Sequence, residues 1–348
     1  MCNKDSSVTD VCFIIPPHML DHLAKHADDQ AHRDRAIENM YLQGHFRGMR
    51  EGISQFAFAG LATGTKRRTI YDAKHKQRLP GTLVRSEGKK ALKDVAVNEA
   101  YDGSGMTYDF YLSVLQRNSV DGAGMRLDST VHYSAQYDNA FWNGQQMVYG
   151  DGDGVLFDRF TKCLDVIGHE LTHGVTQFSA GLAYHDQPGA LNESFSDVFG
   201  TLIKQYALKQ TASQADWLIG AGLFIPKAGV NRTALRSMKA PGTAYNDPQL
   251  GKDPQPAHMK NYVQGSFDNG GVHINSGIPN HAFYLAAAAL GGNAWDVAGH
   301  IWYEALTTAL RSDAQFADAA AATRDIAQHR YTAAAFKAVD DAWKAVGL

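Results

Sequence analysis

Asp165-Val-Ile-Gly-His-Glu-Leu-Thr-His-Gly174 is the stretch of the 348-residue sequence from which the fold and the chemistry are inferred. His169 and His173 lie four residues apart, so on a helix both imidazoles share one face and can hold one metal ion. Glu170 lies beside that face and can reach a water on the metal. Imidazole suits zinc, and two His with one carboxylate leave a fourth position open, as in catalytic sites. The alternative is a pair of surface His on an ordinary helix.

A third ligand is expected in the next apolar-periodic segment, which starts at Gly189. The loop over residues 181–188 would fold this second helix back antiparallel to the first. Glu193 would then face the His pair as the third ligand. Asp197, one turn further on, would accept the free ring N–H of a zinc-bound His and fix its tautomer. The alternative is that both carboxylates are solvated.

Several separated blocks resemble, in the same order, the thermolysin-like zinc metallopeptidases. The blocks are Ile70-Tyr-Asp-Ala-Lys, Asn139-Ala-Phe-Trp-Asn-Gly, Tyr149-Gly-Asp-Gly-Asp-Gly, the two helices above, Leu235-Arg-Ser-Met and Asp268-Asn-Gly-Gly-Val-His-Ile-Asn-Ser-Gly. The resemblance runs from about Arg68 to the C-terminus. Within the family the chain is most similar to the protealysin group, because its short N-terminal segment carries Ile15-Pro-Pro-His-Met-Leu20.

The resemblance implies an α+β, two-lobed zincin fold with a β-rich N-terminal lobe and an α-helical C-terminal lobe. The helix with the His pair would form the floor of the cleft between them. One zinc ion would be held by His169, His173 and Glu193, with Glu170 as the general base. The remaining implied roles are oxyanion donors (His273, Tyr184), a carboxylate that orients His273 (Asp268), and supports of the ligands (Asp197, Asn192).

Substrate-binding residues are also implied by the resemblance. Asn139 and Ala140 would pair with an extended peptide at a sheet edge, unless they belong to an ordinary edge strand. Arg236 would hold a substrate carbonyl, or it is a purely structural Arg between loops. The pocket on the leaving-group side aligns with six apolar residues, so cleavage before Leu, Ile or Phe is expected: Phe157, Phe160, Val166, Ile219, Leu223 and Leu235.

Composition limits the partners that we expect. A net charge of −3 gives no reason to expect nucleic acid or an anionic membrane surface as a partner. The N-terminus is polar and has no apolar run typical of a Sec signal, so we expect a cytoplasmic protein or leaderless secretion. Three cysteines, at positions 2, 12 and 163, make no disulfide framework. We expect a monomer.

The expected organisation is a propeptide (1–50), a linker or processing region (51–68), a β-rich catalytic domain (69–188) and a helical catalytic domain (189–348). Residues 11–15 predict a short strand that Pro16-Pro17 ends, followed by helices at about 18–28 and 31–42. Residues 13–20 would dock on the catalytic domain as its inhibitor. The alternatives are a packed extension without a regulatory role, and a Cys12 thiolate that ligates the zinc directly.

Local patterns complete the expectations. Residues 83–85, 95–97 and 131–134 are typical of strands in an antiparallel sheet, with a helix at 105–116. Helices are expected around 282–290, 295–310 and 333–346. Asp151-Gly-Asp-Gly lacks the downstream Glu of a calcium-binding EF-hand, so a turn is preferred.

Calcium binding is doubtful. Asp165 and Asp216 match the carboxylates that hold a calcium pair in secreted relatives, but Lys204, Leu218 and Ala221 stand where the family has Glu. We therefore predict no double calcium site, with the Lys204 ammonium in place of one ion.

The combined interpretation is a zinc-dependent neutral endopeptidase made as a precursor with a short inhibitory propeptide. Its partners would be peptide and protein substrates and its own propeptide. The competing hypothesis is a zinc-binding protein whose cleft is permanently blocked and which acts as an interaction module.

Overall fold

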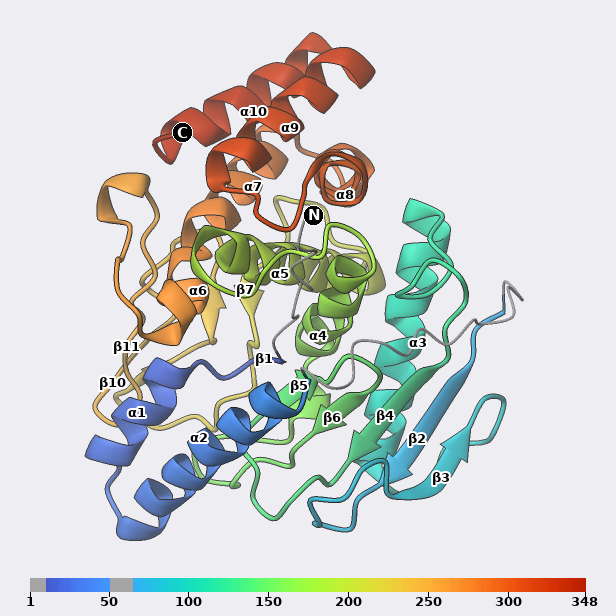
Figure 1. Ribbon diagram of the computed structural model, residues 1–348, viewed down its shortest axis with the longest axis vertical. Coiled ribbons are helices and arrows are strands. Elements are labelled where there is room, and N and C mark those ends of the chain that lie inside the picture. The colour runs from blue at the N-terminus through green and yellow to red at the C-terminus, as the bar shows by residue number, and fades with distance from the viewer. Residues whose placement is uncertain (1–10, 51–64) are drawn as a thin grey trace, which may run out of the picture.

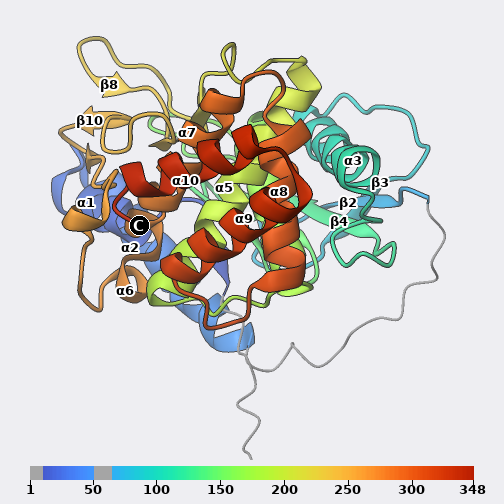
Figure 2. The same cartoon turned by 90° about the horizontal axis from the view of Figure 1, so that it is seen from above.

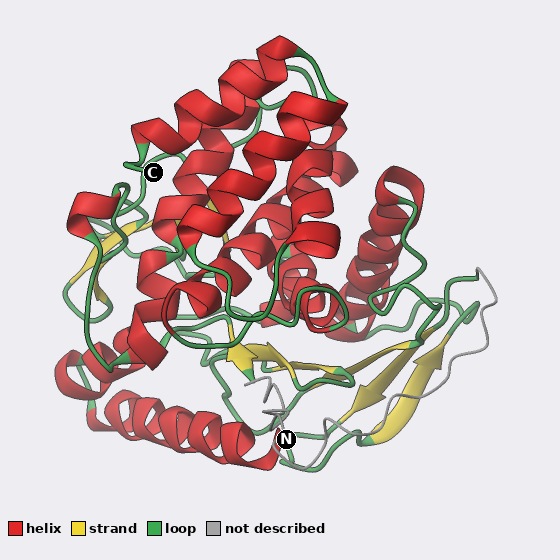
Figure 3. Cartoon of the chain, turned by 45° about the horizontal axis from the view of Figure 1, so that its top comes forward, coloured by secondary structure: helices red, strands yellow, loops and turns green. Residues whose placement is uncertain are grey.

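The structure is a computed structural model that describes residues 11–50 and 65–348, with the side chains of all these residues except 44–50. Strands gather in one lobe and helices in the other, as Figures 1 and 3 show. The expected α+β, two-lobed architecture is confirmed. The predicted linker falls largely on residues 51–64, outside the described part of the chain.

The N-terminal lobe is built on a six-stranded sheet in the order β1-β5-β6-β4-β2-β3. The strands are β1 (Cys12–Phe13), β2 (Arg68–Asp72), β3 (Thr82–Ser86), β4 (Leu127–Val131), β5 (Ala140–Trp142) and β6 (Met147–Tyr149). The prediction of an antiparallel sheet is wrong for its centre, where β2, β4 and β6 run parallel. Parallel neighbours need a long crossover connection, and α3 (Val95–Leu115) supplies it between β2 and β4.

The strand predicted at residues 95–97 is wrong, because these residues form the first turn of α3. The Asp94 carboxylate accepts a hydrogen bond from the Val97 amide at 3.3 Å and so caps the helix N-terminus. Ala96, Val97, Ala100 and Tyr101 are buried at helical spacing. A three-residue apolar run does not distinguish a strand from a helix, and the N-cap decides it here.

Two long helices, α4 (Leu164–Gln177) and α5 (Asp186–Leu208), pack against each other at the centre of the molecule. Their close approach depends on glycine: a Cβ on Gly200 would lie 2.6 Å from the Asp165 carbonyl oxygen of α4. Helix α5 begins three residues before the expected Gly189. The close packing fixes the relative positions of the side chains that α4 and α5 direct at each other.

The C-terminal lobe is a helical bundle, seen from above in Figure 2. Its helical elements are α6 (Asp268–Asn275), α7 (Gly277–Leu290), η3 (Trp295–Gly299), α8 (His300–Glu304), η4 (Ala305–Ala309), α9 (Phe316–Arg330) and α10 (Ala333–Ala345). Short strands lie between α5 and α6: β7 (Leu218–Ile219), β8 (Asn231–Arg232), β9 (Arg236–Ser237), β10 (Tyr245–Asp247) and β11 (Gly251–Lys252). Two short 3₁₀ turns, η1 (Phe160–Lys162) and η2 (Met259–Asn261), complete the described elements. Among the described helices, none combines the length and apolar character needed to cross a bilayer.

The N-terminal segment lies against both lobes. After β1 the chain forms α1 (Pro17–His26) and α2 (Gln30–Arg50), the blue helices at the lower left of Figure 1. Pro17 occupies the first helical position, where a missing N–H costs no hydrogen bond. Ile14, Ile15, Met19 and Leu20 are fully buried in the core shared with α4 and α5.

Candidate active site

The two imidazoles of α4 are oriented by hydrogen bonds from α5. His169 Nδ1 lies 2.8 Å from Asp197 Oδ1, and His173 Nδ1 lies 2.9 Å from Asn192 Oδ1. Each Nδ1–H therefore donates, which leaves a lone pair on each Nε2. The two Nε2 atoms lie 3.0 Å apart in a buried site. Two lone pairs facing each other without water repel, so this arrangement fits a cation bound between them.

Glu193 completes the donor set. Its Oε2 lies 3.5 Å from His169 Nε2, and its Oε1 lies 3.5 Å from His173 Nε2. Zinc–ligand distances of about 2.0–2.2 Å in a tetrahedron separate neighbouring donors by roughly 3.4 Å. Glu193 Oε2 is buried without a hydrogen-bond partner. These donors fit one zinc ion.

The protonation states of His173 and Glu193 suit metal ligands. Burial lowers the pKa of His173 to about 3, so this ring is neutral. Burial works against a charged Glu193, but the neighbouring His273, His173 and His169 hold its pKa below the ordinary value. The site therefore holds a neutral His173 imidazole beside a carboxylate whose charged form is favoured, the forms that bind metal.

Besides His169, three donor atoms hold Asp197. Arg236 donates from Nε and Nη2 at 2.8 Å each, and Asn280 Nδ2 donates at 2.8 Å. Burial opposes its charge, yet Arg236 and His169 hold the pKa of Asp197 well below its usual range. Asn280 comes from α7 and was missed, because no local sequence pattern marks it.

Glu170 lies on the side of α4 that contacts β5. Its Oε2 accepts from the Trp142 amide of β5 at 3.0 Å, while its buried Oε1 has no hydrogen-bond partner. Burial, followed by the nearby Glu193 carboxylate, raises the pKa of Glu170 well above its ordinary value. This carboxyl group can therefore take up and hold a proton.

His273 and Tyr184 meet at the other side of the site. The Tyr184 hydroxyl contacts Glu193 through a short hydrogen bond and lies 3.2 Å from His273 Nε2. Asp268 accepts from His273 Nδ1 at 2.6 Å and from its amide at 2.9 Å. Burial opposes protonation, but Asp268 and Glu193 raise the pKa of His273 above its ordinary value.

A tight turn brings Asp268 and His273 together. The four residues 268–271 all have positive φ, between 51° and 85°. Gly270 and Gly271 adopt this backbone without strain. The turn places the Asp268 carboxylate against both the ring and the amide of His273.

The sheet edge beside this site is paired with the N-terminal segment. Strand β1 runs antiparallel to β5, with Cys12 opposite Trp142 and Phe13 opposite Phe141. The Ile14 amide donates to the Ala140 carbonyl at 3.2 Å, and the Ile15 amide donates to Asn139 Oδ1 at 3.0 Å. Residues 12–15 therefore use the edge that Asn139 and Ala140 were expected to offer to a substrate.

The same segment contacts His273 and Arg236. His273 Nε2 lies 3.0 Å from the Phe13 carbonyl oxygen, and Arg236 Nη1 donates to the Ile14 carbonyl at 3.4 Å. All six residues of the predicted apolar pocket are buried in the cluster that includes Ile14 and Ile15: Phe157, Phe160, Val166, Ile219, Leu223 and Leu235.

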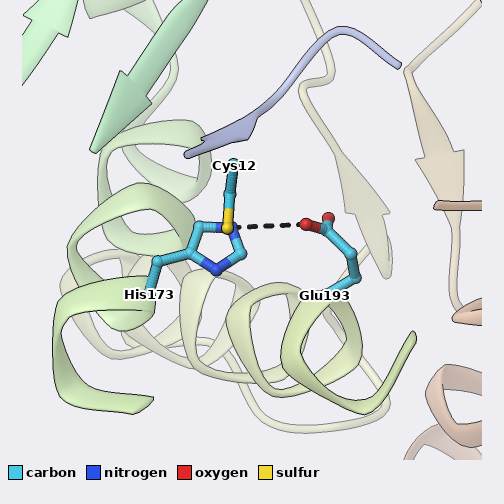
Figure 4. A group of neighbouring side chains, drawn as sticks. All are labelled: Cys12, His173 and Glu193. Carbon is cyan, nitrogen blue, oxygen red and sulfur yellow. Dashed lines mark ion pairs between the residues drawn. The ribbon is translucent and has the colours of Figure 1, made fainter. Parts of the chain in front are cut away.

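Cys12 lies beside His173 and Glu193, as Figure 4 shows. The ligand atoms of Cys12, His173 and Glu193 all lie within 4.8 Å of one another. The sulfur thus reaches the region where a fourth ligand would lie. From the sequence, zinc ligation by Cys12 was only an alternative hypothesis, because a single cysteine between apolar residues rarely indicates a metal ligand.

The Lys204 side chain lies between Asp165 and Asp216, the two residues that match calcium-binding carboxylates of secreted relatives. Its Nζ lies 2.9 Å from Asp165 Oδ2, 3.0 Å from Asp216 Oδ1 and 2.7 Å from the Leu218 carbonyl oxygen. Burial opposes protonation, but Asp165 and Asp216 raise the pKa of Lys204 above its ordinary value. An ammonium group therefore neutralises this carboxylate pair.

Residues 56–177 match the family described as "Thermolysin metallopeptidase, catalytic domain", and residues 180–348 match "Thermolysin metallopeptidase, alpha-helical domain". The chain is 49% identical to an extracellular metalloprotease of Pectobacterium carotovorum subsp. carotovorum over 97% of this chain and 96% of the relative. It is 50% identical to Protease PrtS of Photorhabdus sp. (strain Az29), over 83% and 78%. The solved precursor of protealysin from Serratia proteamaculans is 52% identical, with a TM-score of 0.88 over 97% of this chain and 99% of that one.

Proposed function

Since this chain belongs to the thermolysin family of metallopeptidases, we propose that it is a zinc-dependent neutral endopeptidase whose N-terminal segment inhibits it until removed. It would cleave peptide bonds on the N-terminal side of bulky apolar residues. The observation that carries it is the pair of imidazole Nε2 atoms 3.0 Å apart, with both Nδ1 atoms engaged by α5.

In this proposal His169, His173 and Glu193 hold one zinc ion. Bound there, zinc would polarise a peptide carbonyl and lower the pKa of a water toward about 7. Asp197 accepts a hydrogen bond from His169 Nδ1, and Asn192 accepts one from His173 Nδ1, so each fixes the tautomer of one imidazole. Arg236 and Asn280 in turn keep Asp197 ionised and in place.

In this proposal Glu170 transfers the proton during peptide-bond cleavage. Its carboxylate would take a proton from the attacking water and then deliver it to the leaving nitrogen. The Trp142 amide holds one oxygen of Glu170, so the other oxygen is left to carry the proton. A pKa raised by burial and by Glu193 favours this storage.

His273 and Tyr184 would stabilise the charge that develops on the carbonyl oxygen. In the structure His273 Nε2 lies 3.0 Å from the Phe13 carbonyl oxygen and 3.2 Å from the Tyr184 hydroxyl, which donates to Glu193. Asp268 keeps His273 oriented and favours its protonated form. Preorganised donors of this kind favour the transition state over the bound substrate.

Substrates would bind as an added strand along β5, with Asn139, Ala140 and Arg236 contacting their backbone. The contacts that residues 13–15 make with these groups support this register. The buried apolar residues Phe157, Phe160, Val166, Ile219, Leu223 and Leu235 would receive the side chain that follows the cleaved bond.

Latency would follow from the same contacts. Residues 12–15 fill the edge, and Cys12 places its sulfur beside His173 and Glu193, where a thiolate could take the fourth ligand position. A thiolate ligand would exclude the attacking water. The proposal therefore assigns to Cys12 the role of keeping the precursor inactive.

A peptide-cleavage assay tests the function. Purified protein should cleave casein, lose this activity with a zinc chelator, and recover it with added zinc. On matched peptides, Leu or Phe after the scissile bond should give at least about 100-fold higher kcat/KM than Asp, because burying an unpaired carboxylate in an apolar pocket costs several kcal/mol.

The competing hypothesis is an interaction module with a permanently blocked cleft. It predicts no cleavage of casein at any time and no shortening of the chain during incubation. Zinc-reversible casein cleavage by the purified chain contradicts it.

A further inference from the structure

A second group of metal-binding side chains lies on the N-terminal lobe, away from α4 and α5. His75 follows β2 by three residues, His132 directly follows β4, and Asp151 follows β6 by two residues. These three strands are adjacent and parallel, in the order β6-β4-β2. The carboxyl ends of parallel strands meet at one edge of a sheet, which brings the three side chains together.

The donor atoms are close enough for one ion. The ligand atoms of His75, His132 and Asp151 all lie within 4.8 Å of one another. His132 Nδ1 lies 2.9 Å from Asp151 Oδ1, and His75 Nδ1 lies 3.4 Å from Asp151 Oδ2. Donors around tetrahedral zinc are separated by roughly 3.4 Å, so only small side-chain movements are needed.

The backbone holds both His residues in place. The His75 amide donates to the His132 carbonyl at 2.9 Å, and the imidazole centroids lie 5.5 Å apart. Both residues have positive φ, 56° for His75 and 53° for His132, in a region that side-chain-bearing residues rarely adopt. The turns that give this backbone direct both rings toward Asp151.

A fourth residue, Asp94, supports His132 from the opposite side. Its Oδ2 lies 2.9 Å from His132 Nε2, while Oδ1 accepts from the Val97 amide as the N-cap of α3. If Nε2–H donates to Asp94, Nδ1 carries the lone pair that faces Asp151. Metal-binding His residues commonly have such a carboxylate on the other ring nitrogen, which fixes the tautomer and raises ligand basicity.

We propose that His75, His132 and Asp151 form a second, non-catalytic zinc site on the N-terminal lobe, with Asp94 orienting His132. Two imidazoles and one carboxylate suit zinc, whereas calcium requires six to eight oxygen ligands. His75 is 58% exposed in its side chain and Asp151 26%, so an ion can enter from solvent and retain water as a further ligand. The ion would link the ends of β2, β4 and β6.

A proton competes with the metal at this site. Hydrogen bonds to Asp151, and then to Asp94, raise the pKa of His132 to about 9 despite its burial. Without a metal, an imidazolium therefore bridges the two carboxylates at neutral pH. Zinc must displace this proton from Nδ1, after which Asp94 still accepts from Nε2–H.

The test is a count of the zinc bound by the purified protein. Wild type and His75→Ala are dialysed against the same micromolar zinc, and zinc per chain is measured by elemental mass spectrometry. The His75→Ala protein should bind one ion fewer than wild type. His329→Ala is the matched control, because His329 is also exposed beside a carboxylate, Asp325, and should leave the count unchanged.

Two further measurements locate the ion. Zinc-soaked crystals of wild type, measured at the zinc absorption edge, should show an anomalous peak between the three side chains. Zinc should also raise the melting temperature of wild type more than that of His75→Ala. Equal zinc counts in wild type and His75→Ala would overturn the proposal. The count does not depend on the peptidase site, since both proteins carry that site unchanged.

Discussion

Glu170 has one carboxylate oxygen tied to the Trp142 amide and the other without a partner, in a site shared with the Glu193 carboxylate. Glu170→Ala should leave the three ligands in place and remove the base. We expect zinc content to stay at the wild-type level while kcat/KM on a peptide falls at least about 100-fold. His169→Ala is the matched comparison and should lose both zinc and activity. Near-wild-type turnover by Glu170→Ala would contradict the assigned base.

Lys204 is a residue whose role is electrostatic. Its ammonium group contacts Asp165, whose side chain is 2% exposed. Because Lys204 balances the carboxylates that would otherwise hold calcium, millimolar calcium should leave the melting temperature of wild type almost unchanged. Lys204→Ala should destabilise the protein by roughly 3 kcal/mol, since it leaves a buried carboxylate unpaired.

The matched control for Lys204 is Lys337→Ala, which removes an exposed ion pair with Asp341 and should leave the stability almost unchanged, because water screens such pairs. Both variants can be compared by urea unfolding with and without calcium. A strong calcium-dependent rise in wild-type melting temperature would contradict the prediction.

Among single residues, the ones that could be predicted are those marked by the spacing of residues near them in the sequence. The spacing of His169 and His173 gives them a common helix face, and Glu193 follows on the next apolar-periodic helix. Asn280 and the Trp142 amide carry no such signal, because they reach Asp197 and Glu170 only through the packing of α7 and β5. Positions of this kind depend on tertiary structure.

At the scale of elements, β1 carries the contacts to which we assign the inhibition of the precursor. Cys12→Ser should weaken the contact at the proposed zinc site, because an alcohol binds zinc far less well than a thiolate. We expect the precursor to become active sooner, with a half-time at least about fivefold shorter than wild type under the proposed thiolate ligation. Progress can be followed by peptide cleavage and by mass spectrometry.

Cys163→Ser is the matched control for Cys12. Cys163 is buried near Ala221 and lies outside the ligand set, so its replacement should not change the activation time. Equal activation times for Cys12→Ser and wild type would contradict a role for the Cys12 sulfur in latency.

Helix α1 predicts a pH dependence of inhibition. Burial lowers the pKa of His18 from 6.5 to about 4, and its buried Nδ1 has no hydrogen-bond partner. The released segment would bind a proton below pH 6.5 that the docked segment excludes until about pH 4. Docking should therefore weaken as pH falls through this window, by at most about tenfold per pH unit, and stay constant above it.

This pH dependence can be measured with a synthetic peptide of residues 11–50 as an inhibitor of the mature enzyme. Its inhibition constant should rise between pH 7 and pH 5, and a His18→Gln peptide should show a flatter profile. An inhibition constant for the unmodified peptide that is the same at both pH values would contradict the assignment to His18.

Element types were predictable where periodicity and length agreed, as in α4, α5 and the C-terminal helices. The interpretation failed at residues 95–97, where β-branched residues follow an Asp whose capping hydrogen bond starts α3. The prediction that β2, β4 and β6 belong to an antiparallel sheet was also wrong, because these strands run parallel. Strand direction depends on which strands pair across a long connection, and alternation within a strand carries no information about that.

For the whole molecule, maturation is the main prediction. We expect wild type to shorten itself by about fifty residues, because exposed linkers are the preferred sites of proteolytic cleavage. The predicted linker lies largely outside the described residues, so its cleavage bond remains a prediction from sequence. Glu170→Ala should stay full length. Mass spectrometry of both purified proteins tests this, and intact, fully active wild type would show that the segment is no propeptide.

The pairing of β1 with β5 also bears on solubility. Strand β1 is the outermost strand on its side of the sheet, so its removal exposes the backbone N–H and C=O groups of β5. An unpaired strand edge with buried apolar neighbours such as Phe141 can join the edge of another molecule. The precursor thus keeps this edge covered while the chain folds and accumulates. The mature enzyme, whose edge would be open under the proposed mode of peptide binding, should be the more prone of the two to self-association at high concentration.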